Sequence, residues 1–415
     1  MGQHLMCLRN FGGEHRYFRQ LRSFKERLAQ HERADVQHAA HIYEYLSEQY
    51  FFQNDSLAVL NGTLASLNLA ERCGAVPETI RGYSALALGM AMSGMVRVAR
   101  SYGKRAQRLA EEHGSLPEMA RVRLILGVLS YGLGEWNEAE QNAQEAKLLY
   151  GRLGDRKRAH NSETMAIFIA ILRGNIAQAD RQLGNLLSEM SDDWPVQVRA
   201  WSLASRVLID TIVGQAATEH LNGLKALARD NLIRTDQLLC LGVAAMAHFK
   251  RRETDAALEL ADRGLAVLQE CGVVWGGYVF GAAGIADVYL GCCESASGPV
   301  PADLESRARL ACRQLSRLAR TSAICRPYAL LMQGRASFVA GNKDKARRRW
   351  EQAAAAAETL QMPREQACAI YEIGKGCNHD DPNRQVCLGK AAEIFNRLGA
   401  PGGLAQLQRT HGPQE

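Results

Sequence analysis

Apolar residues recur at helical spacing along most of this chain, and the stretch after Pro117 shows the pattern clearly. From about residue 118 to 131, small and apolar side chains lie three and four positions apart, which predicts one helix. Gly132 to Gly134 predicts a turn, and residues 136 to 150 predict a second helix with charged residues opposite a stripe of alanines. Those alanines are Ala139, Ala143 and Ala146. Because the period is that of a helix and not of a strand, the stretch is predicted to form a helical hairpin.

Turn signals repeat along the chain at a constant spacing. One series is Asn54, Gly94, Gly134, Gly174 and Gly214, and a second, half a repeat out of phase, is Gly74, Gly114 and Gly154. Glycine and asparagine tolerate positive φ and therefore close helices and reverse the chain. Two such turns in every repeat predict a stack of helical hairpins, which is a solenoid. The period slips after residue 230, where the next turn is predicted at Arg252 without a glycine.

The same pattern predicts a leading helix near His15 to Gln30, followed by nine hairpins. Their approximate spans are residues 33–73, 77–113, 117–151, 155–189, 195–229, 233–271, 274–320, 324–360 and 363–398. We therefore expect a leading segment and helix over 1–32, a helical solenoid over 33–400 and a C-terminal tail over 401–415. The seventh hairpin contains the segment Glu294 to Ala302, whose serine, glycine and proline residues predict a surface insertion or a hinge.

The hairpins resemble the tetratricopeptide repeat. The small residue in the first helix of that repeat matches Gly127, and the small residues of its second helix match Ala139 and Ala146. The spacing from Gly94 to Gly134 makes the unit longer than the common form of this repeat, so the likeness is to longer, divergent members of the superfamily. Near the C-terminus the match is fuller, at Gly334, Gly341, Ala346, Trp350 and Ala353. The resemblance implies an all-α, tetratricopeptide-like solenoid, a right-handed superhelix of about nine helical hairpins.

The charge of the chain is modest, with a formal net charge of +6 at neutral pH. That value is not typical of a nucleic-acid-binding protein, and we expect no direct contact with nucleic acid. A local basic cluster spans Lys343 to Arg349 and has two interpretations. It is either the solvated face of a helix or a contact for nucleic acid or an acidic partner. No aromatic residues interleave with it, as a base-stacking surface would require.

The cysteines and the apolar segments bear on the compartment. Eleven cysteines, odd in number and unevenly spaced, favour a reducing cytoplasm over a disulfide framework. The first residues lack the apolar core of a signal peptide. The apolar segment Gly272 to Cys293 contains Asp287 and five glycines, and it lies where the repeat places the first helix of a hairpin. We therefore expect a buried repeat helix there rather than a membrane span, and no membrane contact.

Motifs for catalysis are not found in the sequence. It contains no G-x-x-x-x-G-K-[ST] phosphate-binding loop and no H-E-x-x-H zinc motif. Cysteine, histidine and aspartate residues gather between Cys377 and Cys387, but their spacing fits no standard zinc site. Within that segment, Asp381 and Pro382 predict the start of a helix. We therefore expect no catalytic residues, no bound metal and no cofactor.

A partner surface is the functional feature that the sequence does predict. In repeats of this kind the first helix of each hairpin lines the concave face, where a protein or peptide partner binds. The register gives five candidate partner-binding residues: Arg81, Arg121, Tyr131, Phe168 and Trp201. Arginine and aromatic residues commonly dominate binding energy. The alternative is that the aromatic residues pack between stacked hairpins.

A second resemblance involves segments at both ends of the chain. They are residues 39–52, 66–72, 326–331, 355–363, 380–382 and 392–400. In this order they resemble the C-terminal helical region of bacterial multidomain proteins that carry an AAA- or STAND-type ATPase domain, often with an adenylate/guanylate cyclase domain. This chain lacks the phosphate-binding loop and the cyclase carboxylates, so that catalysis would lie upstream or on another polypeptide. The unpaired leading helix indicates a fragment or a split product of the longer architecture.

The sequence therefore predicts a non-catalytic, protein-binding scaffold in the cytoplasm and, by resemblance, a role in bacterial signalling. Two alternatives stay open. In the first, the chain is the repeat region of an ATPase or nucleotide cyclase whose catalytic domains are absent here. In the second, it is the ligand-sensing repeat domain of a transcriptional regulator.

Overall fold

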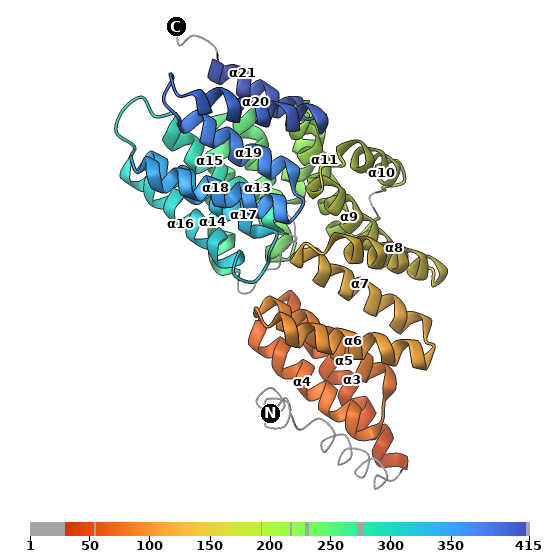
Figure 1. Cartoon of the computed structure of the whole chain (residues 1–415). Coiled ribbons are helices and arrows are strands. Elements are labelled where there is room, and N and C mark those ends of the chain that lie inside the picture. Colours follow the sequence, from red (N-terminus) through yellow and green to blue (C-terminus); the bar gives the residue numbers. More distant parts are fainter. Residues whose placement is uncertain are drawn as a thin grey trace. The chain divides into compact units, whose positions relative to one another are not determined.

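The computed structural model describes residues 30–53, 55–191, 193–215, 218–228, 232–271 and 278–411. This described part contains nineteen helices and no strand (Figure 1). The predicted all-α class is therefore confirmed. The leading helix expected near His15 to Gln30 lies outside the described residues except for Gln30, and so does the turn at Asn54.

Eighteen of the helices form nine hairpins, as the turn series predicts. The pairs are α3 (Gln30–Phe52) with α4 (Ser56–Cys73), α5 (Val76–Met92) with α6 (Val96–His113), α7 (Leu116–Leu133) with α8 (Trp136–Arg152), α9 (Arg156–Leu172) with α10 (Ile176–Ser188), α11 (Val196–Ile212) with α12 (Thr218–Leu227), α13 (Arg234–Lys250) with α14 (Thr254–Glu270), α15 (Val279–Glu294) with α16 (Ala302–Leu318), α17 (Cys325–Val339) with α18 (Lys343–Thr359), and α19 (Pro363–Gly376) with α20 (Pro382–Arg397). We call the first helix of each pair its A helix and the second its B helix. Within unit 1 and within unit 2, as defined below, successive hairpins contact each other through their A helices and through the B helix of one hairpin and the A helix of the next, as in a tetratricopeptide-like solenoid; examples are α3 with α5, α13 with α15, and α18 with α19.

The predicted turns have the backbone conformation that their glycines suggest. All seven glycines of the two series have positive φ: Gly74, Gly94, Gly114, Gly134, Gly154, Gly174 and Gly214. The turn predicted at Arg252 also has positive φ, at 64°, although the residue carries a side chain. The repeat therefore continues through the place where its glycine is lost, and the chain accepts local backbone strain there.

The chain divides into two compact units. Unit 1 comprises Met1–Ser130 and Gln141–Ala159, and unit 2 comprises Tyr131–Glu140 and His160–Glu415. Among the described helices, α3 to α6 belong to unit 1 and α10 to α21 belong to unit 2. The three helices between them, α7, α8 and α9, contribute residues to both units.

Within unit 2, the A helices α13 and α15 approach each other closely at glycines. A Cβ atom on Gly242 would lie 2.6 Å from the Cα of Gly281, and one on Gly284 would lie 2.9 Å from the carbonyl carbon of Gly242. Since these neighbours are backbone atoms, only glycine fits at the crossing. The apolar segment thus forms a buried repeat helix from Val279 onward, as expected, while residues 272–277 lie outside the described part.

No helix among the described residues is both long enough and apolar enough to cross a membrane.

Hairpin turns in the middle of the chain contact the C-terminal hairpins within unit 2. Trp136, at the start of α8, donates a hydrogen bond from Nε1 to the carbonyl oxygen of Leu360 at 2.5 Å, across 224 residues of sequence. The turn at Gly174 lies so close to Leu398 that a Cβ atom on the glycine would come within 2.6 Å of it. These hairpin turns are therefore covered by later repeats. In a solenoid whose repeats contact only their neighbours, the same turns would be exposed.

The segment after residue 400 is a helix and not the expected tail. Helix α21 (Pro401–His411) packs against α20 and α11, which lie far apart in sequence (Figure 1). Two adjacent glycines, Gly402 and Gly403, lower the helix propensity of this segment. Packing requires them, because a Cβ on Gly402 would lie 2.7 Å from the carbonyl oxygen of Thr211, and one on Gly403 would lie 2.6 Å from the ring of Phe395.

The small residues of α8 give a first test of the register. Ala139 and Ala146 are fully buried. Ala139→Leu should overpack this helix contact and lower the free energy of unfolding by about 1–3 kcal/mol. Thermal melts followed by circular dichroism measure the change, with Leu148→Ala on the exposed side of α8 as the control. An unchanged melting temperature for Ala139→Leu would show that the register of α8 is wrong.

Candidate functional site

Four A helices carry a buried acid at their third residue, and each acid accepts a hydrogen bond from the preceding A helix. The acids are Glu78, Glu118, Asp236 and Glu365, and their donors in the same order are Gln37, Arg81, Trp201 and Tyr328. A buried carboxylate is costly unless a donor satisfies it. The bond therefore links successive repeats at one fixed place on the face formed by the A helices.

The link in unit 1 joins three A helices. Arg81 of α5 donates from Nε and Nη2 to Glu118 of α7 at 3.0 and 2.7 Å, and its Nη1 lies 3.2 Å from Glu44 of α3. The hydrogen bond from Arg81 to Glu118 raises the pKa of the guanidinium above its already high ordinary value. The guanidinium of Arg81 is therefore bound by carboxylates on two other A helices, and it holds α3 and α7 in position relative to α5.

The link in unit 2 uses the indole of Trp201. Its Nε1 donates to Asp236 at 2.7 Å. Burial raises the pKa of Asp236 to about 6, although the hydrogen bond from Trp201 acts in the opposite direction. The indole nitrogen is thus engaged between α11 and α13, so Trp201 fixes these two helices against each other.

The link is absent between α7 and α9, as it is at three other junctions, where the third residue of the later A helix is Val198, Gly281 or Pro327. Arg121 is the sixth residue of α7, the position that Arg81 has in α5 and Trp201 has in α11, but the third residue of α9 is Arg158 and not an acid. Among the described residues, the Nε of Arg121 is buried and has no hydrogen-bond acceptor. Its ion-pair partner is Glu44, at 3.7 Å from Nη2, and Glu44 is shared with Arg81. Arg121 is therefore a donor without the matching acid of the next repeat.

Arg121 lies in a small cationic cluster that solvent can reach. The guanidinium of Arg158 lies 5.8 Å from the ring centroid of Tyr150, and its Nη1 is 2.6 Å from Asp155 at the start of α9. Burial raises the pKa of Tyr150 to about 12, while the positive charges of Arg158 and Arg121 act in the opposite direction. The side chain of Arg121 is 35% exposed. We call Arg121, Tyr150 and Arg158 the Arg121 site; it offers two cations and a neutral phenol to an anion from solution.

Two of the predicted candidates are buried, so the expectation that they line an open face is wrong for them. Tyr131 is 4% exposed and packs edge-on against Trp136, and Phe168 is 6% exposed and stacks on Phe280 at 5.7 Å. Phe280 in turn meets Tyr328 of α17. The physical reason is that Trp136 packs on Tyr131 at the end of α7, and that later A helices of unit 2 cover Phe168 on α9. A pattern confined to single repeats does not reveal the second of these contacts.

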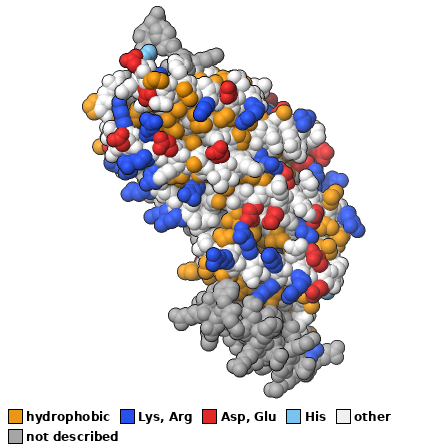
Figure 2. Space-filling model, viewed as in Figure 1, with side chains coloured by type: hydrophobic (Ala, Val, Ile, Leu, Met, Phe, Trp, Pro, Cys, Tyr) orange, Lys and Arg blue, Asp and Glu red, His pale blue; other side chains and the backbone are white. Residues whose placement is uncertain are grey.

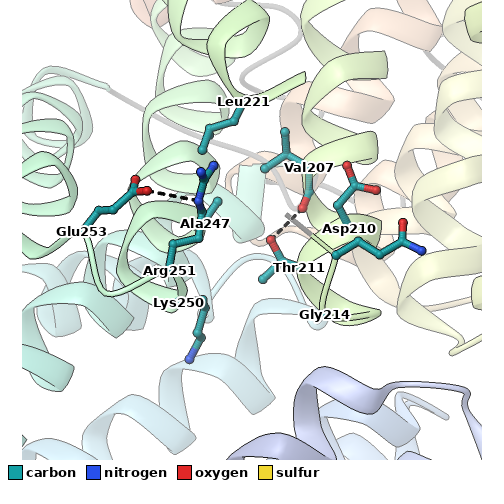
Figure 3. Close-up of a pocket in the computed structure, with 10 residues that line it drawn as sticks. Val207, Asp210, Thr211, Gly214, Leu221, Ala247, Lys250, Arg251 and Glu253 are labelled. Carbon is teal, nitrogen blue, oxygen red and sulfur yellow. Dashed lines mark hydrogen bonds and ion pairs between the residues drawn. The ribbon is translucent and has the colours of Figure 1, made fainter. Parts of the chain in front are cut away.

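A pocket of about 420 Å³ lies in unit 2 between the ends of α11 and α13 and the helix α12 (Figure 3). Its charged side chains already have partners within ion-pair distance: Asp210 with Arg206 at 2.7 Å, Lys250 with Asp287 at 3.1 Å, and Arg251 with Glu253 at 3.2 Å. A charged ligand would have to displace these pairs. The charges of the Arg121 site are paired too, but among the described residues the Nε of Arg121 lacks an acceptor and no polar side-chain atom lining the pocket is buried without a partner. The pocket therefore supports the ligand-sensing alternative less well than the Arg121 site supports partner binding.

The segment between Cys377 and Cys387 connects α19 to α20. The side chain of Asp381 accepts a hydrogen bond from the backbone N–H of Asn383 at 2.9 Å, and Pro382 is the first residue of α20. The predicted helix start is therefore confirmed. No group of three or more potential metal ligands occurs in the part of the chain that the structure describes.

Four residues around Arg121 were not among the sequence-based candidates. They are Glu44, Glu118, Tyr150 and Arg158. A signal for one of them is present in the sequence, because Pro77-Glu78 and Pro117-Glu118 recur one repeat apart. Such a pair shows that the acid belongs to the repeat, but only the structure shows that it is buried and which donor it accepts from.

Comparisons with known proteins find similarity in fold and do not assign the chain to a family. No family model matches the chain, and no curated protein matches it. Similar solved structures include an IFIT1 monomeric mutant with m7Gppp-AAAA, at 14% identity and a TM-score of 0.47, covering 94% of this chain and 92% of that one. A second is an IFIT1 monomeric mutant with Gppp-AAAA, at 14% identity and a TM-score of 0.46, covering 92% and 89%. At these values the two structures say nothing about what this chain binds.

Proposed function

We propose that this chain is a non-catalytic helical-repeat scaffold that binds an acidic segment of a protein partner on the A-helix face of unit 1. Arg121 carries the proposal. In four other repeats the A-helix donor meets a buried acid of the next repeat, and at Arg121 the chain places Arg158 there instead. A carboxylate from a partner would supply the acceptor that the repeat provides elsewhere.

The energetics support this assignment. A buried donor without an acceptor costs about 1–3 kcal/mol, and a hydrogen bond between charged groups recovers more than a neutral one. The Nε of Arg121 is such a donor, while the rest of its side chain is partly exposed and so within reach of a partner. Arg81 is expected to hold Glu44 and Glu118 in place beside the bound segment rather than to contact it.

The wider context of the function rests on the resemblance alone. We propose that the partner is a signalling ATPase or nucleotide cyclase, since the chain resembles the helical region that accompanies those domains in bacterial proteins. The odd and uneven set of cysteines supports a reducing compartment, and we propose the cytoplasm.

Selection from a displayed library of random peptides tests the proposal with a defined probe. The wild-type chain should enrich peptides that share an aspartate or glutamate at one position. Arg121→Ala should lose this enrichment, because the guanidinium is the expected hydrogen-bond donor to the carboxylate. Arg121→Lys should keep only part of it, because an ammonium lacks the planar fork that binds a carboxylate through two hydrogen bonds.

The matched control is Arg97→Ala, an exposed arginine on the B helix α6 of the same unit. It removes the same charge and should leave the enriched set unchanged. The proposal fails if the enriched peptides share no acid, or if Arg121→Ala selects the same peptides as the wild type.

A further inference from the structure

Basic residues are concentrated in one segment of unit 2. Residues 302–349 contain twelve lysines and arginines and three acids, so this segment alone has a larger net charge than the +6 of the whole chain. The segment comprises the B helix α16, the A helix α17 and the start of the B helix α18. The cluster at Lys343 to Arg349 is therefore one part of a larger basic surface.

The B helices α16 and α18 expose several of these charges to solvent. Arg309, Arg313 and Arg317 are all exposed and follow one another at intervals of four residues along α16, over about 12 Å. On α18, Lys345 and Arg348 are exposed as well. Figure 2 shows lysine and arginine side chains gathered on the edge of the molecule where α16 and α18 lie in Figure 1.

Several of these cations are not neutralised by the chain. Arg309 pairs with Glu305 at 2.7 Å. In contrast, Arg313, Arg317, Lys345 and Arg348 have no carboxylate within ion-pair distance among the described residues. We call these four the α16–α18 basic surface. A row of uncompensated charges on a modestly charged protein is costly through self-repulsion and favours an anionic partner.

We propose that the α16–α18 basic surface binds the phosphate backbone of double-stranded nucleic acid. The exposed side chains of these helices fit that partner better than the other polyanions. A membrane-surface helix inserts large apolar side chains, and a protein interface buries apolar or aromatic anchors. None of the large hydrophobic residues that are exposed in the described part of the chain lies on α16 or α18. Phosphate contacts need only the cations.

Helices α16 and α18 expose no aromatic side chain, and this favours a duplex over a single strand. Proteins that bind single strands without sequence preference stack bases on aromatic residues. Helix α16 has no aromatic residue, and Trp350 of α18 is 2% exposed. Binding is therefore expected to be independent of base sequence. The net charge of the whole chain does not reveal this surface, because acidic residues elsewhere in the sequence offset its positive charge.

Fluorescence anisotropy with a short labelled DNA duplex, and with an RNA duplex of the same sequence, tests the proposal. The wild-type chain should bind both duplexes, and the logarithm of the association constant should fall with that of salt concentration with a slope of roughly −3 to −4, for about four phosphates. The triple variant Arg313→Glu, Arg317→Glu, Arg348→Glu should weaken binding by roughly tenfold or more.

The control reverses three exposed arginines elsewhere, with Arg152→Glu, Arg156→Glu and Arg181→Glu, and so makes the same change in net charge. It should weaken duplex binding by much less than the roughly tenfold expected of the triple variant, and circular dichroism melts should show both variants folded. If the α16–α18 triple variant unfolds, Arg313→Gln with Arg317→Gln repeats the test with a smaller charge change. The proposal is overturned if the control weakens duplex binding as much as the triple variant. It is also overturned if wild-type protein binds poly-glutamate, phosphatidylserine vesicles or a single strand more tightly than the duplex.

Discussion

Replacing Gly281 with alanine is expected to lower the free energy of unfolding by about 3 kcal/mol. A Cβ atom at Gly281 would lie 2.8 Å from the Cα of Leu239 on the facing helix α13. Because the atom it meets belongs to the backbone, no side-chain rotation relieves the contact, and α13 and α15 must move apart. Urea unfolding followed by circular dichroism measures the loss.

The control for Gly281 is Gly184→Ala on α10. No atom lies within 4 Å of the Cβ position at Gly184, and its φ is not positive. There the substitution should be neutral or stabilise the chain by about 0.5–1 kcal/mol, since alanine is the better helix former. Equal effects at Gly281 and Gly184 would show that α13 and α15 do not cross at their backbones.

Arg335→Leu is expected to cost about 3–5 kcal/mol. Arg335 of α17 is 7% exposed, and its guanidinium lies 2.5 Å from Asp287 and 2.7 Å from Glu294, with Glu372 at 3.9 Å. Removing the cation leaves these carboxylates buried near one another. The control is Arg309→Leu, whose ion pair with Glu305 is exposed, and its cost should stay within about 1 kcal/mol.

The dependence on pH separates this explanation from a simple loss of packing. Burial opposes ionisation of Asp287, but the charges of Lys250 and Arg335 outweigh it and hold the pKa of that carboxyl well below its usual range. In the wild type this group therefore stabilises the fold above about pH 4, and the contribution is lost as the pH falls further. Burial has the larger effect on Glu372 and raises its pKa.

In Arg335→Leu the cluster loses a cation, so the pKa values of these carboxyls should rise above their unfolded values. Groups of that kind destabilise the fold when ionised, and protonation relieves the cost. The deficit relative to wild type should therefore shrink between pH 7 and about pH 5. A deficit that stays constant over this window would show that lost packing, and not uncompensated charge, explains it.

The hairpins could be predicted from the sequence because their turns depend on local chemistry. The repeating turn series located the turns, including the one at Arg252, and Asp381 located the start of α20. The contact of Trp136 with Leu360 could not be predicted in this way, because repeats of the same local pattern can stack with or without later contacts. Tyr131 and Phe168 were misplaced for that reason.

The candidate site was only partly accessible from the sequence. The helical register brought Arg81, Arg121 and Trp201 to one position of their A helices, and the structure shows that they share it. What differs among them is the third residue of the next A helix, which is an acid after Arg81 and Trp201 and is Arg158 after Arg121. The sequence contains that difference. It can be interpreted only once the structure shows that the third residue of an A helix packs against the sixth residue of the A helix before it.

A double-mutant cycle between Arg121 and the shared acid of a selected peptide tests the central claim most directly. The affinities to measure are those of the wild type and Arg121→Ala, each for the peptide and for its amide counterpart, at physiological salt. We expect a coupling free energy of about 1–3 kcal/mol, because a charged hydrogen bond between Arg121 and the peptide carboxylate forms only in the complex. The same coupling should persist when the α16–α18 basic surface carries its three glutamates. Additive effects of the two changes, with no coupling, would contradict a partner carboxylate at Arg121.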